Sequence, residues 1–134
     1  MELLQPQFKR AQTPTLDFTT ETGFQSPAHD YRVKSLSLDE LLIRSPAATF
    51  FVRVDHSDID GIEREDILVV NRAHALVEGR VAIMVIDDEF ALRRLRRYGQ
   101  TWLLQTDTVT QQQKIDSTMI CWGIVDAVIR TCWP

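Results

Sequence analysis

The second part of the chain is built from short β-prone runs that follow one another closely. Each run is rich in aromatic and β-branched residues, and turn residues separate the runs. Asp87-Asp88 joins two of them directly, which predicts a tight hairpin, and Gly123 predicts a bulge within the longest run. The predicted strands are residues 48–54, 67–70, 80–86, 89–95, 102–105 and 118–132. With so little helix between them, these strands predict a mostly β, compact antiparallel fold.

One short helix and an N-terminal arm are expected before these strands. Ser37 and Glu40 have the spacing of a capping box, and the helix is predicted to end at Pro46. The apolar residues at helical spacing between them are Leu38, Leu41 and Leu42. Residues 1–30 carry prolines and threonines without an apolar period, which is typical of an extended arm and not of a packed element. We therefore expect an arm, residues 1–30, and a folded domain, residues 31–134.

Length and charge limit the classes of protein to consider. A chain of 134 residues suits a single domain, and 44% apolar with 25% charged content is ordinary for a globular protein. A net charge of −4 gives no global electrostatic reason to bind nucleic acid. No apolar run approaches the roughly 20 residues that cross a bilayer, and the first residues lack the pattern of a signal peptide. The sequence thus predicts a cytoplasmic protein without membrane contacts or direct sequence-specific DNA binding.

The two cysteines, Cys121 and Cys132, lie in one predicted strand. In a continuous strand they would be roughly 36 Å apart at about 3.3 Å per residue, whereas a disulfide needs Cα atoms about 4.4 to 6.8 Å apart. We expect two free thiols that are buried and inert.

An acidic loop, residues 55–61, invites a calcium or a nucleophile interpretation. Aligned with a calcium-binding EF-hand loop, it lacks the expected carboxylates at three ligand positions, which here are His56, Arg64 and Ile67. His56 precedes Ser57, but neighbours in an extended chain point to opposite faces, which argues against the hydrogen bond that a catalytic base must make. No metal or cofactor is expected.

The single basic cluster is formed by Arg93, Arg94, Arg96 and Arg97. On a strand, Arg94 and Arg96 share one face, whereas Arg93 shares the other with Leu95. One interpretation is a solvated strand edge that charges protect from aggregation, and the other is a local patch for phosphate or an acidic partner.

Three segments together resemble the UmuD branch of the S24 self-cleaving serine peptidases, which share their fold with the LexA repressor. Residues 22–31 (TGFQSPAHDY) are similar to the UmuD segment that contains the self-cleavage site. Residues 41–52 resemble the stretch that enters the catalytic strand, and residues 89–95 (EFALRRL) resemble the strand that carries the catalytic lysine. The resemblance implies a LexA/UmuD-type peptidase fold.

The resemblance also assigns roles to residues. In this family a neutral lysine takes the proton of a serine, which then attacks a peptide bond in the N-terminal arm. Ser57 falls at the nucleophile position, Arg93 at the lysine position, and Thr22-Gly23 at the cleavage site, where UmuD has cysteine before glycine. Asp58 stands where the family has methionine, and its charge would oppose a serine alkoxide.

Arginine at the lysine position is the decisive departure. A lysine with a reference pKa of about 10.4 needs about 4 to 5 kcal/mol of destabilisation to be half neutral at pH 7, which burial can supply. Arginine starts near a pKa of about 13.8 and would need about 9 kcal/mol. Arg93 therefore cannot act as the general base, and we predict that Ser57 is a relic. An ion pair of Arg93 with Asp58 or Asp60 is left open, as is rescue by Lys34 or Lys114.

By resemblance, the chain is expected to be an accessory subunit of an SOS translesion DNA polymerase that has lost self-cleavage. Its expected partners are a second copy or a UmuD paralogue, a UmuC-type polymerase and the RecA filament. Whether it mimics the uncleaved or the cleaved form stays open. The alternative is an active self-processing serine peptidase with Ser57 as nucleophile and another base. A LexA-like repressor is disfavoured, because residues 1–30 cannot form a helix-turn-helix bundle.

Overall fold

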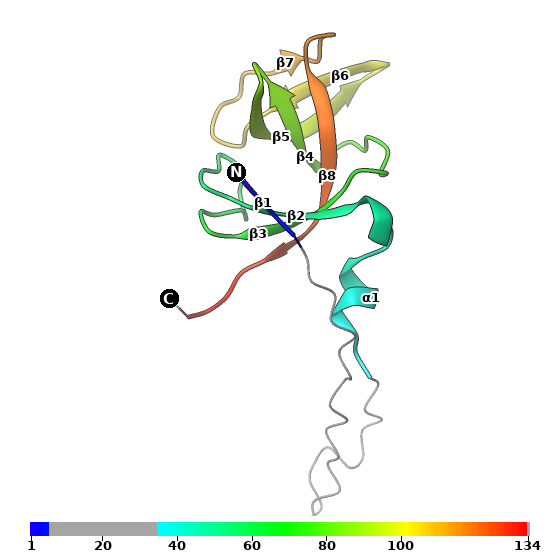
Figure 1. The fold of residues 1–134 in the computed structure, drawn as a ribbon. Helices are drawn as coiled ribbons and strands as arrows, with labels where there is room; N and C mark the ends of the chain where they lie inside the picture. Colours follow the sequence, from blue (N-terminus) through cyan, green and yellow to red (C-terminus); the bar gives the residue numbers. More distant parts are fainter. Residues whose placement is uncertain (6–34, 134) are drawn as a thin grey trace, which may run out of the picture.

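The computed structural model describes residues 1–5 and 35–133 (Figure 1). Thr22, Gly23 and Lys34, and with them the expected cleavage site, lie outside the described residues. The described chain forms one antiparallel sheet with one short α-helix, which confirms the predicted mostly β fold.

The eight strands lie in the order β1-β2-β3-β8-β4-β5-β6-β7. They are β1 (Glu2–Leu4), β2 (Thr49–Arg53), β3 (Ile67–Asn71), β4 (Val81–Ile86), β5 (Glu89–Tyr98), β6 (Thr101–Gln105), β7 (Gln113–Lys114) and β8 (Ile120–Ile129). The last strand, β8, lies in the middle: its second half pairs with β3 and its first half with β4. Figure 1 shows β1, β2 and β3 gathered around one end of β8, and β4 to β7 around the other.

All the predicted strands are present, and two turn predictions are confirmed. Asp87 and Asp88 have φ angles of 52° and 64°, as a two-residue type I′ turn requires. The register between β4 and β8 shifts next to Gly123, which confirms the bulge. A Cβ on Gly123 would lie 2.5 Å from Cγ1 of Val70, so this close approach of β3 and β8 requires glycine.

The structure extends β5 beyond the predicted run and adds the short edge strands β1 and β7. It also corrects the basic cluster: β5 lies between β4 and β6, so the cluster is not at a sheet edge.

Helix α1 spans Leu38–Leu42, and the side chain of Ser37 accepts a hydrogen bond from the Glu40 backbone N–H at 3.4 Å, as predicted. The predicted end at Pro46 is wrong, because Ile43 already has an extended backbone and Pro46 instead starts a 3₁₀ turn. No residue of α1 is buried, and Figure 1 shows the helix projecting away from the sheet.

The core has two clusters of buried side chains. The first contains Val52, Val54, Ile59, Ile62, Leu68, Val70, Ile83, Leu92 and Val125, and the second contains Ala82, Met84, Leu95, Leu104 and Ile124. Ile59 and Ile62 belong to the loop between β2 and β3, so the loop that carries Ser57 is anchored in the first cluster.

Candidate functional site

The loop between β2 and β3 holds Ser57 and is closed at its base by backbone hydrogen bonds. Val54 donates to the Asp66 carbonyl at 2.9 Å, and Glu65 donates to the Val54 carbonyl at 2.8 Å. Glu65 reaches this position with a φ of 73°, in the left-handed region that non-glycine residues rarely adopt. These bonds hold the base of the loop, and the buried side chains of Ile59 and Ile62 hold the part beside Ser57.

The Ser57 hydroxyl hydrogen-bonds to the backbone two residues along the chain. Its Oγ accepts from the Ile59 N–H at 3.1 Å and lies 3.2 Å from the Ile59 carbonyl, to which it can donate. This is the local turn that serine hydroxyls commonly stabilise. Within residues 1–5 and 35–133, no histidine, lysine or arginine hydrogen-bonds to this hydroxyl.

His56 does not serve Ser57 either. Its Nε2 lies 3.3 Å from Oδ2 of Asp58, and 79% of its side chain is exposed. This geometry agrees with the prediction that neighbouring residues point apart.

Arg93 lies on β5 opposite Ala82, and its Nη1 donates to the Leu92 carbonyl at 2.8 Å. Leu92 belongs to the first core cluster and Leu95 to the second, so alternation along β5 places Arg93 on the face of the second cluster. The loop with Ser57 instead packs into the first cluster. The structure therefore does not bring Ser57 and Arg93 into hydrogen-bond contact, and Arg93 forms no ion pair with Asp58 or Asp60 among the described residues.

Arg94, the next residue along β5, is connected to the loop through Asp107. Its guanidinium donates two hydrogen bonds to the carboxylate of Asp107, at 2.9 and 2.8 Å, and a third to the Gly79 carbonyl at 2.8 Å. Oδ2 of Asp107 also accepts from the Asp60 N–H at 2.8 Å, and the Asp107 N–H donates to the Asp58 carbonyl at 2.9 Å. Both side chains are largely buried. One carboxylate thus fastens the loop beside Ser57 to β5.

The Arg94–Asp107 ion pair also shifts the pKa values of its two partners. Hydrogen bonds from Arg94 hold the pKa of Asp107 below its ordinary value, although burial opposes that shift. The same contact raises the pKa of Arg94. In the sequence Arg94 stands out only as a member of the basic cluster, and Asp107 does not stand out at all, because nothing in the spacing of the two residues distinguishes a pair from two unrelated charges.

A second ion pair fastens the other end of the loop. Arg130, just after β8, donates to both carboxylate oxygens of Asp66, at 2.8 and 2.7 Å, and Asp66 also accepts from the Glu63 N–H at 2.8 Å. The Asp66 side chain is 2% exposed. Hydrogen bonds from Arg130 lower the pKa of Asp66 against the opposing effect of burial.

The other reactive side chains lie apart from Ser57. Lys114, the second lysine considered as a replacement base, is exposed on β7, the edge strand remote from the loop in the sheet order. Cys121 and Cys132 are free thiols, but the prediction that both are buried is wrong, because Cys121 is only partly buried and Cys132 is exposed just after β8. Burial raises the pKa of Cys121. The part of the chain that the structure describes contains no group of three or more His, Cys, Asp or Glu that could hold a metal ion.

Comparison with known proteins decides the family. A family model described as "Peptidase S24-like" matches residues 14–125. The chain belongs to this family. It is 42% identical over 113 residues to protein ImpA of Shigella flexneri, which covers 82% of this chain and 78% of the relative. It is 38% identical over 132 residues to protein SamA of Salmonella typhimurium, covering 96% and 94%, and 34% identical over 108 residues to protein MucA of Escherichia coli, covering 77% and 74%.

The S24-like family and these relatives confirm the resemblance to UmuD and support a UmuD-like role. As to membranes, the described residues include no helix with the length and apolar character needed to cross a bilayer.

Proposed function

We propose that this chain is a UmuD-like accessory subunit of an SOS translesion DNA polymerase and that it does not cleave itself. Membership of the S24-like family and the similarity to ImpA, SamA and MucA support the UmuD-like part of the proposal. The loss of cleavage rests on one residue: Arg93 stands at the position where the resemblance expects the lysine base.

The chemistry of arginine explains why a single replacement, at position 93, would be enough to abolish self-cleavage. A guanidinium is not observably deprotonated in proteins, so Arg93 cannot take a proton from Ser57 near neutral pH. The Ser57 hydroxyl is engaged with Ile59, and the nearby loop carboxylates Asp58 and Asp60 would disfavour an alkoxide there. Ser57 and Arg93 are therefore proposed as the remains of a catalytic dyad.

An uncleaved chain keeps its N-terminal residues. Strand β1 pairs with β2 in the folded domain, which favours a mimic of the uncleaved form over a mimic of the cleaved one. The proposed partners are a second copy or a UmuD paralogue, a UmuC-type polymerase and the RecA filament. Helix α1 offers a surface for another chain, because Leu38 and Leu41 are 62% and 59% exposed.

Intact mass of the purified protein tests the loss of cleavage. The protein would be incubated with RecA, single-stranded DNA and a nucleotide, and separately at about pH 10, where a far larger share of a lysine is neutral than at pH 7. We expect the wild type to stay whole. Arg93→Lys is expected to release a fragment ending at Thr22 in the incubation with RecA, where binding must bring the lysine to Ser57, because the structure does not bring positions 57 and 93 into hydrogen-bond contact. Ser57→Ala in the Arg93→Lys background should abolish that fragment.

Two outcomes would count against the proposal. Release of residues 1–22 by the wild type, but not by Ser57→Ala, would show an active peptidase with another base. Cleavage in neither the wild type nor Arg93→Lys would show that the arginine alone does not silence the site.

A further inference from the structure

One face of strand β5 is closed at its start and open at its end. Along this face Leu92 is 3% exposed and Arg94 is largely buried, whereas Arg96 is partly buried and Tyr98 is 62% exposed. Every second residue of a strand points to the same side, so these four side chains share one face. The end of β5 therefore extends beyond the core cluster that contains Leu92, and Tyr98 is in contact with solvent.

The neighbouring strands add a row of side chains to this face. Arg96 lies opposite Leu103 of β6, which in turn lies opposite Lys114 of β7. Neighbouring strands are about 4.8 Å apart, so the backbones of the two cations are about 10 Å apart across the row. Neither cation makes an ion pair within residues 1–5 and 35–133. We call Arg96, Tyr98, Leu103 and Lys114 the open face.

A glutamine connects Tyr98 to the neighbouring strand. The side-chain amide of Gln112 donates to Oε1 of Gln105 at 2.9 Å and, more weakly, to the Tyr98 hydroxyl at 3.5 Å. The hydroxyl end of Tyr98 thus has a polar contact, while most of the residue stays exposed. An aromatic ring in this position can stack on a planar group of a partner.

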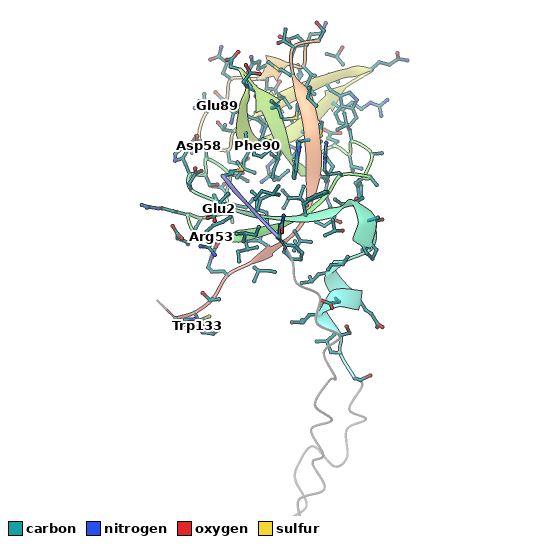
Figure 2. All side chains as sticks on the ribbon, in the orientation of Figure 1. Glu2, Arg53, Asp58, Glu89, Phe90 and Trp133 are labelled. Carbon is teal, nitrogen blue, oxygen red and sulfur yellow. The ribbon has the colours of Figure 1, made fainter. Side chains whose placement is uncertain are left out.

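The part of the molecule that carries the open face is positively charged, although the net charge of the chain is −4. Residues 93–115 contain five cations and one acid, Asp107, which gives this segment a charge of +4. Asp107 is paired with Arg94 and bonds through its N–H to Asp58, so the acids of the loop lie at the Arg94 end of the face. Figure 2 shows the labelled Asp58 well apart from the turn that joins β5 to β6. The local charge at the open face therefore favours an anionic partner.

We propose that the open face binds single-stranded DNA without sequence preference. Arg96 and Lys114 pair with phosphates, and the ring of Tyr98 stacks on a base. Sites of this kind combine cations that follow the nucleic-acid backbone with aromatic rings on which bases stack. An acidic protein segment would use the two cations but has no base to stack on Tyr98. The choice of DNA over RNA rests on the proposed polymerase role, whereas the binding of a single strand rests on the open face alone.

Fluorescence anisotropy of a labelled oligodeoxythymidine, titrated with the full chain at a series of salt concentrations, tests the site. For single strands the slope of log affinity against log salt concentration is about −0.7 for each phosphate that the protein neutralises. Arg96→Gln and Lys114→Gln should each reduce the magnitude of this slope by about 0.7. Tyr98→Ala should weaken the binding of oligodeoxythymidine at least about fivefold and leave the binding of an abasic oligomer of the same length unchanged.

Arg97→Gln is the matched control, because it removes the same charge one residue away but on the other face of the sheet. Arg97 lies opposite Trp102, and its guanidinium carbon is 5.5 Å from the centre of that ring. This variant should leave the salt slope unchanged. Urea denaturation of each variant shows that it is folded.

Absence of binding by the wild type would overturn the proposal. An equal change of slope in Arg97→Gln would also overturn it, because the attraction would then come from the positive segment as a whole. Tighter binding of an oligoglutamate peptide, weakened by Arg96→Gln but not by Tyr98→Ala, would assign the open face to an acidic protein segment instead. Tighter binding of oligouridine than of oligodeoxythymidine would overturn the choice of DNA. The intact-mass test of self-cleavage is independent of all these results, so a failure here is distinguishable from a failure of the proposed function.

Discussion

Two arginine–aspartate pairs hold the same loop, but they differ in how much of each pair is in contact with water. In the Arg94–Asp107 pair both side chains are largely buried, and Asp107 also bonds to the loop backbone. In the Asp66–Arg130 pair the carboxylate is buried, whereas Arg130 is about half exposed. The difference predicts how much each substitution costs. A charged side chain that remains buried after its partner is removed has neither water nor a partner to compensate its charge, whereas one that remains at the surface is hydrated.

The largest effect is expected from Arg94→Met. It leaves the Asp107 carboxylate buried without its cation, and removing one partner of a buried pair typically lowers the free energy of unfolding by about 3 kcal/mol. Urea denaturation measures the change. The matched control is Arg96→Met on the same strand. Arg96 makes no ion pair among the described residues and acts on Asp107 only as a nearby charge, so the change in stability should be less than about 0.5 kcal/mol. Equal losses of stability in Arg94→Met and Arg96→Met would show that the ion pair with Asp107 does not set Arg94 apart.

A smaller effect is expected from Asp66→Asn. Arg130, left behind, can be solvated, and asparagine can still accept the hydrogen bond from the Glu63 N–H. A loss of about 1 to 2 kcal/mol in the free energy of unfolding is expected from the weakened charged hydrogen bonds. Glu63→Gln is the control, because its carboxylate is exposed and 3.7 Å from Arg130, and exposed pairs contribute little. A loss from Asp66→Asn as large as that from Arg94→Met would contradict the comparison.

The smallest effect is expected on the pH dependence of stability. The pKa values of Asp66 and Asp107 are both lowered in the folded protein, so each carboxylate stabilises the fold above its unfolded pKa of about 3.9. This stabilisation is lost as the pH falls below that value through the folded pKa. Asp107→Asn should therefore flatten the acid limb of a plot of unfolding free energy against pH, while leaving its shape between about pH 6 and 8 unchanged. An unaltered acid limb would show that Asp107 is not held ionised by Arg94.

Much of the fold could be predicted because its signals are local. The capping serine of α1, the Asp87-Asp88 turn and the bulge at Gly123 each depend on residues within a few positions of one another. Strand β1 carried no such signal, because three residues are too few to show alternation, and only pairing with β2 defines them as a strand. Helix α1 ends at Leu42 and not at the predicted Pro46. A proline marks the furthest point that a helix can reach, but the helix can end before it.

The site divides in the same way. Positions of Ser57 and Arg93 could be taken from a resemblance to a known family, and the inability of arginine to act as a base follows from its pKa alone. The two ion pairs around the loop could not be predicted. Arg130 is distant in sequence from Asp66, and Arg94 and Asp107 are brought together by the path of β5 and β6, so in the sequence they look like any other charges.

The place of β8 has a consequence for how the protein is made. This strand is the last of the described strands along the chain, yet within the described sheet it alone joins β3 to β4. A ribosome-bound chain that lacks residues 120–129 can form the hairpin of β4 and β5, but it cannot unite the two groups of strands. Because these closing contacts are made late and between distant residues, we expect the domain to complete its fold only after residues 120–129 have left the ribosome, with β3 and β4 unpaired along one side until then.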